Sequence, residues 1–187
     1  MLIRHLPNVL TGARLVLAVP IGWLILEQRF AGALVLFFVA GFSDALDGFI
    51  AKRYGYQSWI GGVLDPIADK TLIVVCFLAL GSVGVVPLWL VLLVIVRDLV
   101  IVAGAASYYF LVERFEPEPT LVSKLNTLLL LVLVLGALVD RGLVTLPSPV
   151  LQVLAYGAAV TTVVSGLGYV WDWSARARRQ GFSRDGQ

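Results

Sequence analysis

Long apolar segments, separated by short groups of charged residues, glycine or proline, dominate the chain. Each segment is close to the roughly 20 residues that an α-helix needs to cross the ~30 Å apolar core of a bilayer. The segments cover about residues 9–27, 31–52, 62–81, 87–112, 121–140 and 148–172. The pattern predicts an all-α integral membrane protein, a bundle of six transmembrane helices.

The boundary between the third and fourth helices is the least marked by charge. Residues 71–96 contain no charged side chain, and a helix across all of them would be too long for one ordinary span. The segment LGSVGVVP at 80–87 contains two glycines and a proline, which favour a turn. We therefore expect two helices here.

Composition supports a membrane protein without a separate soluble domain. Of 187 residues, 59% are hydrophobic and 14% are charged, with a mean hydropathy of +0.93, whereas soluble domains are about 25% charged. We expect residues 1–187 to form one domain. The net charge of +2 gives no support to nucleic-acid binding, and the single cysteine, Cys76, excludes an intramolecular disulfide.

The placement of basic residues predicts the orientation in the membrane, because Lys and Arg are enriched in cytoplasmic loops. Only Arg29 and Arg141 flank loops on one side. The other side has Arg4, Lys52, Arg53, Arg114, Lys124, Arg176, Arg178, Arg179 and Arg184. Both termini are therefore expected in the cytoplasm. The N-terminus has no signal-peptide or transit-peptide pattern, which favours a bacterial inner membrane.

Four aspartates lie between residues 43 and 70, at the cytoplasmic junction of the second and third helices. Asp44 and Asp47 are three positions apart, and Asp65 and Asp69 are four apart, so each pair shares one face of a helix. Two like charges about 5 Å apart repel by roughly 3 kcal/mol at an effective dielectric constant of about 20. Bound divalent cations would offset this repulsion.

Carboxylates without nearby His or Cys favour Mg²⁺ or Mn²⁺ over zinc, and four of them suffice for two ions about 4 Å apart. Such a pair suits phosphoryl transfer. Gly48, Gly61 and Gly62 would let a phosphate approach the backbone, and Lys52 and Arg53 would neutralise its oxygens. A solvated acidic loop would not explain this combination of spacings.

The stretch resembles the signature of the CDP-alcohol phosphatidyltransferases, D-x2-D-G-x2-A-R-x8–9-G-x3-D-x3-D. The matching positions are Asp44, Asp47, Gly48, Ala51, Gly61, Asp65 and Asp69. The signature arginine is replaced by Lys52, which keeps the charge but loses the bidentate fork of a guanidinium group.

The resemblance implies roles for these residues. Asp44 and Asp65 would bridge two metal ions, Asp47 would bind one, and Asp69 would bind the other. Asp69 would also act as general base, although metal ligation alone is the alternative. The implied contacts to the CDP-linked donor are Pro7, Asn8, Val9, Leu10, Gly48, Lys52 and Ser58. Arg14, expected to face the bundle from the first helix, would meet the donor diphosphate.

Members of this family differ in the alcohol that accepts the transferred group. Segments outside the signature, VRDLVIVAGAASYY at 96–109 and PTLVSKLNT at 119–127, resemble the CMP-forming cardiolipin synthases. Phosphatidylglycerophosphate synthases share the earlier segments almost equally and are the alternative. The candidate acceptor-binding residues are Arg97, Asp98, Lys124 and Asn126. Arg97 and Asp98 could instead pair within the bundle, and Lys124 could reach toward the membrane surface.

The resemblance therefore implies an enzyme that transfers the phosphatidyl group of CDP-diacylglycerol to phosphatidylglycerol and releases CMP. It also implies a homodimer. Two other classes of protein are alternatives. A divalent-cation transporter would need acidic residues along a complete pathway, whereas here they lie at one side. A structural membrane protein would leave the spacing of the aspartates and glycines unexplained.

Overall fold

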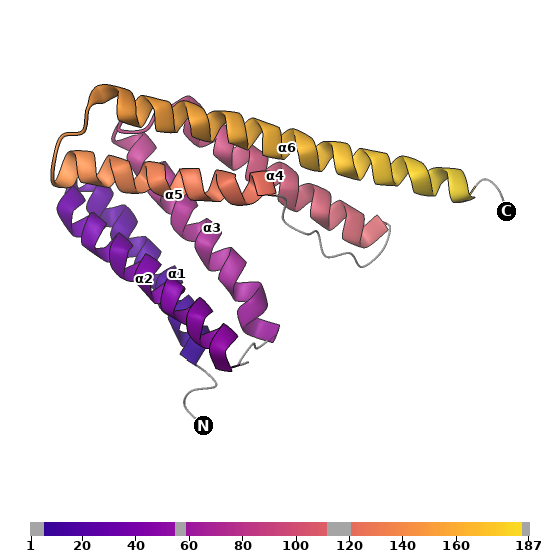
Figure 1. The fold of residues 1–187 in the computed structure, drawn as a ribbon, viewed down its shortest axis with the longest axis horizontal. Helices are drawn as coiled ribbons and strands as arrows, with labels where there is room; N and C mark the ends of the chain where they lie inside the picture. Colours follow the sequence, from indigo (N-terminus) through magenta and orange to yellow (C-terminus); the bar gives the residue numbers. More distant parts are fainter. Residues whose placement is uncertain (1–5, 55–58, 112–120, 185–187) are drawn as a thin grey trace.

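Six α-helices make up the described part of the chain (Figure 1). The computed structural model describes the backbone over residues 6–54, 59–111 and 121–184, and side chains over 12–43, 68, 70–104, 121–147 and 149–171. The helices are α1 (Leu6–Leu26), α2 (Phe30–Tyr54), α3 (Trp59–Ser82), α4 (Leu88–Leu111), α5 (Leu121–Gly142) and α6 (Ser148–Arg184). These residues contain no strand, so the all-α prediction is confirmed.

The apolar pattern located the helices well, with one exception. Eleven of the twelve helix ends lie within three residues of the predicted positions. The exception is the end of α6, which continues to Arg184 instead of stopping near residue 172. The added segment contains two Ala and four Arg, which are good helix formers. Hydropathy marks where a helix stops being apolar, and this helix continues beyond that point.

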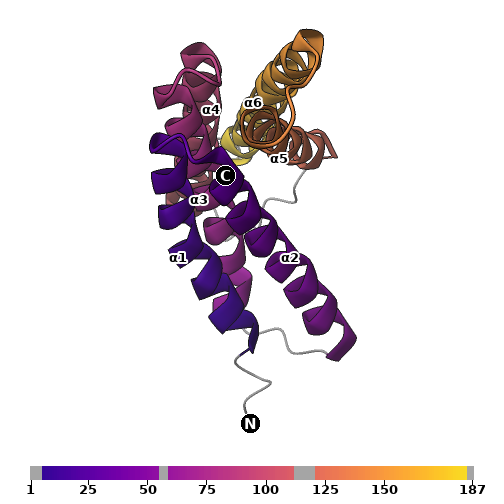
Figure 2. The same ribbon diagram turned by 90° about the vertical axis from the view of Figure 1, so that its left-hand side faces the viewer.

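The helices form two groups of three. In the first group α1 packs against both α2 and α3, and in the second α6 packs against both α4 and α5. Contacts of α5 with α2 and α3, and of α3 with α4, join the groups. Figure 1 shows the groups close together where α1 turns into α2 and α5 into α6, and diverging toward the end of α2 and the beginning of α3; Figure 2 shows the arrangement from the side.

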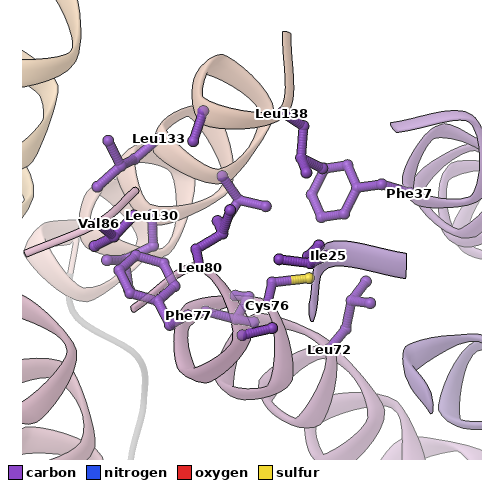
Figure 3. Close-up of a cluster of buried hydrophobic side chains, with 14 of the residues drawn as sticks. Ile25, Phe37, Leu72, Cys76, Phe77, Leu80, Val86, Leu130, Leu133 and Leu138 are labelled. Carbon is purple, nitrogen blue, oxygen red and sulfur yellow. The ribbon is translucent and has the colours of Figure 1, made fainter. Parts of the chain in front are cut away.

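The hydrophobic core lies where the two groups meet. Its members include Ile25 of α1, Phe37 of α2, Phe77 and Leu80 of α3, and Leu138 of α5 (Figure 3). Ile25, Phe77, Leu80 and Leu138 are fully buried. Where lipid instead of water surrounds the helices, close van der Waals packing of such side chains drives their association. The core therefore holds together the end of the bundle that is remote from the aspartates.

Many large apolar side chains point outward. Val16, Trp23, Phe42, Leu167 and Trp171 each have about two thirds of their surface exposed. Such a surface would be unfavourable in water and is typical of a protein that faces lipid. By length and composition, two helices of the described residues, Leu121–Gly142 and Pro149–Trp171, suffice to cross a bilayer.

Two turns at the converging end use the left-handed backbone conformation. Gly84, after α3, has φ +73°, and its N–H donates to the Gly81 carbonyl at 3.1 Å. Gln28, after α1, has φ 56°, and its N–H donates to the Ile25 carbonyl at 2.9 Å. Both are Schellman-type helix ends, which glycine favours because it has no Cβ. The turn predicted at 80–87 is confirmed, and Gln28 occupies a position at which glycine would be less strained.

We expect opposite effects from substitutions at the two turns. Gln28→Gly should raise the free energy of unfolding by up to about 1 kcal/mol, because a residue other than glycine is disfavoured at positive φ. Gly84→Ala should lower it by about 1 kcal/mol for the same reason. Thermal unfolding in detergent, followed by circular dichroism, measures both.

Gly157→Ala provides the matched control. Gly157 is helical, and a Cβ there would meet nothing within 4 Å. Alanine favours a helix over glycine by about 1 kcal/mol, so this change should stabilise the protein. Equal effects of Gly84→Ala and Gly157→Ala would contradict the assignment of the strained turn.

Candidate active site

The aspartate signature spans the end of α2, at Tyr54, and the beginning of α3, at Trp59. Asp44 and Asp47 are in α2, and Asp65 and Asp69 are in α3. Asp47 precedes the end of α2 by seven residues, or about 10 Å along the axis, and Asp65 follows the start of α3 by six, or about 9 Å. Both pairs thus occupy helical backbone at similar distances from the adjoining helix ends.

The side chains of the signature lie outside the described residues. This holds for the four aspartates, Gly48 and Lys52, and for the first turn of α1, where Pro7, Asn8, Val9 and Leu10 were predicted to contact the donor. Ser58 lies outside the described backbone as well. Among the described side chains, no group of three or more His, Cys, Asp or Glu could hold a metal ion. The chemistry of the aspartates, four hard oxygen donors on two helices, fits Mg²⁺ or Mn²⁺.

Arg14 lies inside the first group of helices. Its side chain is only 1% exposed, and α1 packs on both α2 and α3, the helices that carry the aspartates. A cation is rarely placed in a membrane-embedded bundle without a functional partner. This position agrees with the predicted approach of Arg14 to the donor diphosphate, which remains a prediction.

A second set of charged residues joins the two groups of helices. Arg97 of α4 is 8% exposed, and its Nη1 donates to Asp98 Oδ1 at 2.6 Å. Its Nη2 donates to Ser123 Oγ of α5 at 2.9 Å and to Ser165 Oγ of α6 at 2.6 Å. Lys70 Nζ of α3 lies 3.5 Å from the same Asp98 oxygen. We call these five residues the Arg97 cluster; they link α3, α4, α5 and α6.

The Arg97 cluster contains more positive than negative charge. Two cations, Lys70 and Arg97, share the single carboxylate of Asp98. Arg97 makes the shorter, charge-assisted contact and is buried, whereas the Lys70 side chain is 45% exposed. The Lys70 ammonium is therefore the more weakly neutralised of the two cations, and the five residues together carry one more positive than negative charge.

A polar layer next to this cluster contains Asn126 of α5. Asn126 is 1% exposed, and its Oδ1 accepts hydrogen bonds from Thr161 Oγ1 at 2.9 Å and Thr162 Oγ1 at 2.8 Å. In this layer and the Arg97 cluster, the buried nitrogens Asn126 Nδ2 and Arg97 Nε have no hydrogen-bond partner among the described residues. Both are donors, and buried donors are normally paired. The layer therefore lacks acceptor oxygens, which water or a phosphate would supply.

The four predicted acceptor residues lie in different environments in the structure. Arg97 and Asp98 are in direct contact, and Asn126 lies in the adjoining polar layer. Lys124 is exposed on α5 and makes none of the described contacts of the Arg97 cluster. Sequence analysis did not identify Lys70 or the hydroxyl partners, which are Ser123, Thr161, Thr162 and Ser165. The sequence gives little indication of these hydroxyl residues, because Ser and Thr are frequent in apolar helices. Their role becomes visible only when the structure shows the side chain that each one contacts.

The fold and these buried charges define the class of protein. It is a helical, membrane-associated protein that keeps cations inside an apolar bundle and carries an aspartate signature on two adjoining helices. The chain matches the CDP-alcohol phosphatidyltransferase family over residues 4–164 and belongs to that family. This membership favours a transferase over the transporter and the structural protein.

Individual relatives refine the comparison. The chain is 36% identical to a CMP-forming cardiolipin synthase of Rattus norvegicus over 180 residues, which cover 88% of this chain and 60% of the relative. It is 32% identical to a CDP-diacylglycerol--glycerol-3-phosphate 3-phosphatidyltransferase of Rickettsia bellii over 175 residues, which cover 89% of this chain and 93% of the relative. The chain thus spans about 60% of the length of the rat cardiolipin synthase.

Removing one hydroxyl from the Arg97 cluster should destabilise the bundle. We expect Ser165→Ala to lower the free energy of unfolding by about 1–3 kcal/mol, because a buried guanidinium would lose a charge-assisted hydrogen bond. Ser82→Ala is the matched control, because Ser82 Oγ is exposed and donates only to the Leu78 carbonyl of its own helix, at 2.8 Å. Thermal unfolding of both variants in detergent checks this, and equal losses would contradict it.

Proposed function

We propose that this protein is a CMP-forming cardiolipin synthase. The free hydroxyl oxygen of phosphatidylglycerol attacks the phosphorus that carries the diacylglycerol in CDP-diacylglycerol. A new phosphorus–oxygen bond forms, the bond to the CMP oxygen breaks, and the hydroxyl proton passes to a carboxylate of the protein. The products are cardiolipin and CMP.

The donor side of this proposal rests on α1, α2 and α3. Arg14, buried in α1, would bind the diphosphate. Lys52 would neutralise further phosphate charge, Gly48 would leave space for the nucleotide, and the first turn of α1 with Ser58 would complete the donor site. The support for these residues is their match to the family signature and the helical backbone on which α2 places Gly48 and Lys52.

The aspartates would hold two Mg²⁺ or Mn²⁺ ions, with Asp44 and Asp65 shared, Asp47 on one ion and Asp69 on the other. When bound, such ions stabilise negative charge on the diphosphate. Asp69 would accept the proton of the attacking hydroxyl. Its place at the end of the signature, four residues beyond Asp65 on the same helix, allows one side chain to meet both the ions and the acceptor.

The acceptor side would lie on α4 and α5, with Arg97, Asp98 and Asn126 nearest to it and Lys124 at its exposed edge. The observation that carries the choice of acceptor is the charge of the Arg97 cluster, in which two cations share one carboxylate. One remaining positive charge matches the single negative charge of the phosphodiester in phosphatidylglycerol. The resemblance to the rat cardiolipin synthase supports the same choice.

We further propose that all six helices cross a bacterial inner membrane, with both termini in the cytoplasm, and that the protein is a homodimer. α1, α2, α3 and α4 contain 21, 25, 24 and 24 residues, which at about 1.5 Å per residue is long enough to span a bilayer core. The apolar surface and the distribution of basic residues support this topology.

A second acceptor, glycerol 3-phosphate, deserves a direct test. The Rickettsia bellii relative, which this chain covers almost completely, carries the name of a glycerol-3-phosphate phosphatidyltransferase. A soluble acceptor with two negative charges would be expected to need more converging cations than the one excess charge of the Arg97 cluster. The charge balance therefore favours the lipid acceptor.

Product analysis distinguishes the two acceptors. Purified protein in detergent receives CDP-diacylglycerol with Mg²⁺ or Mn²⁺ and either phosphatidylglycerol or glycerol 3-phosphate, and lipids are identified by mass spectrometry. We expect cardiolipin and CMP with phosphatidylglycerol alone. Phosphatidylglycerophosphate as the main product would assign the protein to the second acceptor.

Substitutions in the signature should separate the base from the metal ligands. Asp69→Asn should lower kcat by about 10²–10⁴, because a general base contributes a factor of this size. Because Asp69 also holds one ion in this proposal, Asp69→Asn should weaken Mn²⁺ binding in equilibrium dialysis, but less than Asp65→Asn, which replaces a carboxylate shared by both ions and should lose both Mn²⁺ and activity. Loss of Mn²⁺ binding in Asp69→Asn to the same extent as in Asp65→Asn would leave Asp69 a metal ligand only.

A further inference from the structure

A groove of about 370 Å³ lies between α3 and α4. Lys70 and Asp98 of the Arg97 cluster line it, and the remaining walls are almost entirely apolar. These walls include Val74, Val75, Ile95, Leu99 and Val102. Leu99 and Val102 are 62% and 57% exposed, so this side of the groove is open at the surface of the bundle. The groove thus combines a charged site with an open apolar channel.

The charge in the groove is complementary to a phospholipid head group with one negative charge. Asp98 is held by Arg97 at 2.6 Å, and the longer contact, 3.5 Å, leaves the half-exposed Lys70 ammonium able to bind a second anion. A phosphodiester at Lys70 would complete the charge balance, and an acyl chain beside it would cover Val74, Ile95 and Leu99. Neither a soluble anion nor an uncharged hydrocarbon would satisfy both parts of the groove.

We propose that the groove binds the acceptor phospholipid, with its phosphodiester at Lys70 and one acyl chain between α3 and α4. The donor is less suitable, because its diphosphate carries more charge and none of its candidate ligands lies on α4; Arg14, for example, is buried in α1. Lys70 directly follows Asp69, and successive residues of a helix point about 100° apart. The acceptor would therefore lie on the face of α3 next to the catalytic carboxylate.

This inference rests on the proposed function, since it assigns the groove to the acceptor of that reaction. Two sets of variants test it. Leu99→Trp fills the groove from its exposed wall, and Leu167→Trp is the matched control, because Leu167 of α6 is similarly exposed, at 65%. Lys70→Gln removes the charge, and Lys70→Arg restores it.

The kinetic assay measures KM for each lipid separately. Photo-crosslinking then locates the acceptor in the full-length protein. It uses phosphatidylglycerol with a diazirine in one acyl chain and is carried out without divalent metal, so that no turnover occurs. We expect Leu99→Trp and Lys70→Gln to raise KM for phosphatidylglycerol about tenfold, the effect of losing about 1.4 kcal/mol of binding. KM for CDP-diacylglycerol should stay within about twofold. Crosslinks should map to α3 and α4 and decrease in Leu99→Trp, while Leu167→Trp should resemble the wild type. Lys70→Arg should bind phosphatidylglycerol more tightly than Lys70→Gln, because it keeps the positive charge.

Two results would overturn the assignment. One is an equal response of Leu99→Trp and Leu167→Trp in both KM and crosslinking. The other is an increase of KM for CDP-diacylglycerol instead, which would place the donor in the groove. A failure of the proposed function is recognised separately, because the wild-type protein would then make no cardiolipin, whereas crosslinking to α3 and α4 requires no turnover.

Discussion

A guanidinium group inside an apolar bundle needs partners for its N–H groups, and Arg97 draws its partners from three helices. Its contacts to Asp98, Ser123 and Ser165 connect α4 with α5 and α6, and Asp98 in turn contacts Lys70 of α3. Breaking a buried ion pair by removing one partner typically costs about 3–5 kcal/mol. The hydrogen bonds of Arg97 therefore hold α4, α5 and α6 together, and the Lys70–Asp98 contact joins this group to α3.

In this account the two groups of helices have different roles. α1, α2 and α3 carry the signature aspartates and the buried Arg14, and we propose that the donor and the metal ions bind there. α4, α5 and α6 hold Arg97 and the polar layer around Asn126. α3 belongs to the first group and also contacts α4 and α5 of the second, and Asp69 and Lys70 are consecutive residues of α3. In this account α3 is the element across which the acceptor hydroxyl meets the activated donor, and both lipids reach it from within the membrane.

The sequence predicted the helices closely because six apolar segments of suitable length leave few alternatives. It also predicted the turn at Gly84, where glycine and proline mark a break, but it gave no sign that Gln28 would adopt a positive φ. Arg97 and Asp98 were recognisable as costly charges within a helix. Their partners were not, because Ser123 and Ser165 are 42 residues apart and neither serine is unusual alone. Lys70 was overlooked beside Asp69, since only the packing of α3 on α4 shows that it meets Asp98.

The most direct test of this account is the distance between the bound metal and the acceptor phosphate. The phosphorus NMR relaxation rate of phosphatidylglycerol bound to the protein can be measured in the presence of Mn²⁺, which is paramagnetic, and again in the presence of Mg²⁺, which is not. Because consecutive Cα atoms are about 3.8 Å apart, a phosphate at Lys70 should lie within roughly 10 Å of an ion at Asp69 and should relax much faster with Mn²⁺. Equal relaxation with the two ions, while both the lipid and Mn²⁺ remain bound, would contradict the account.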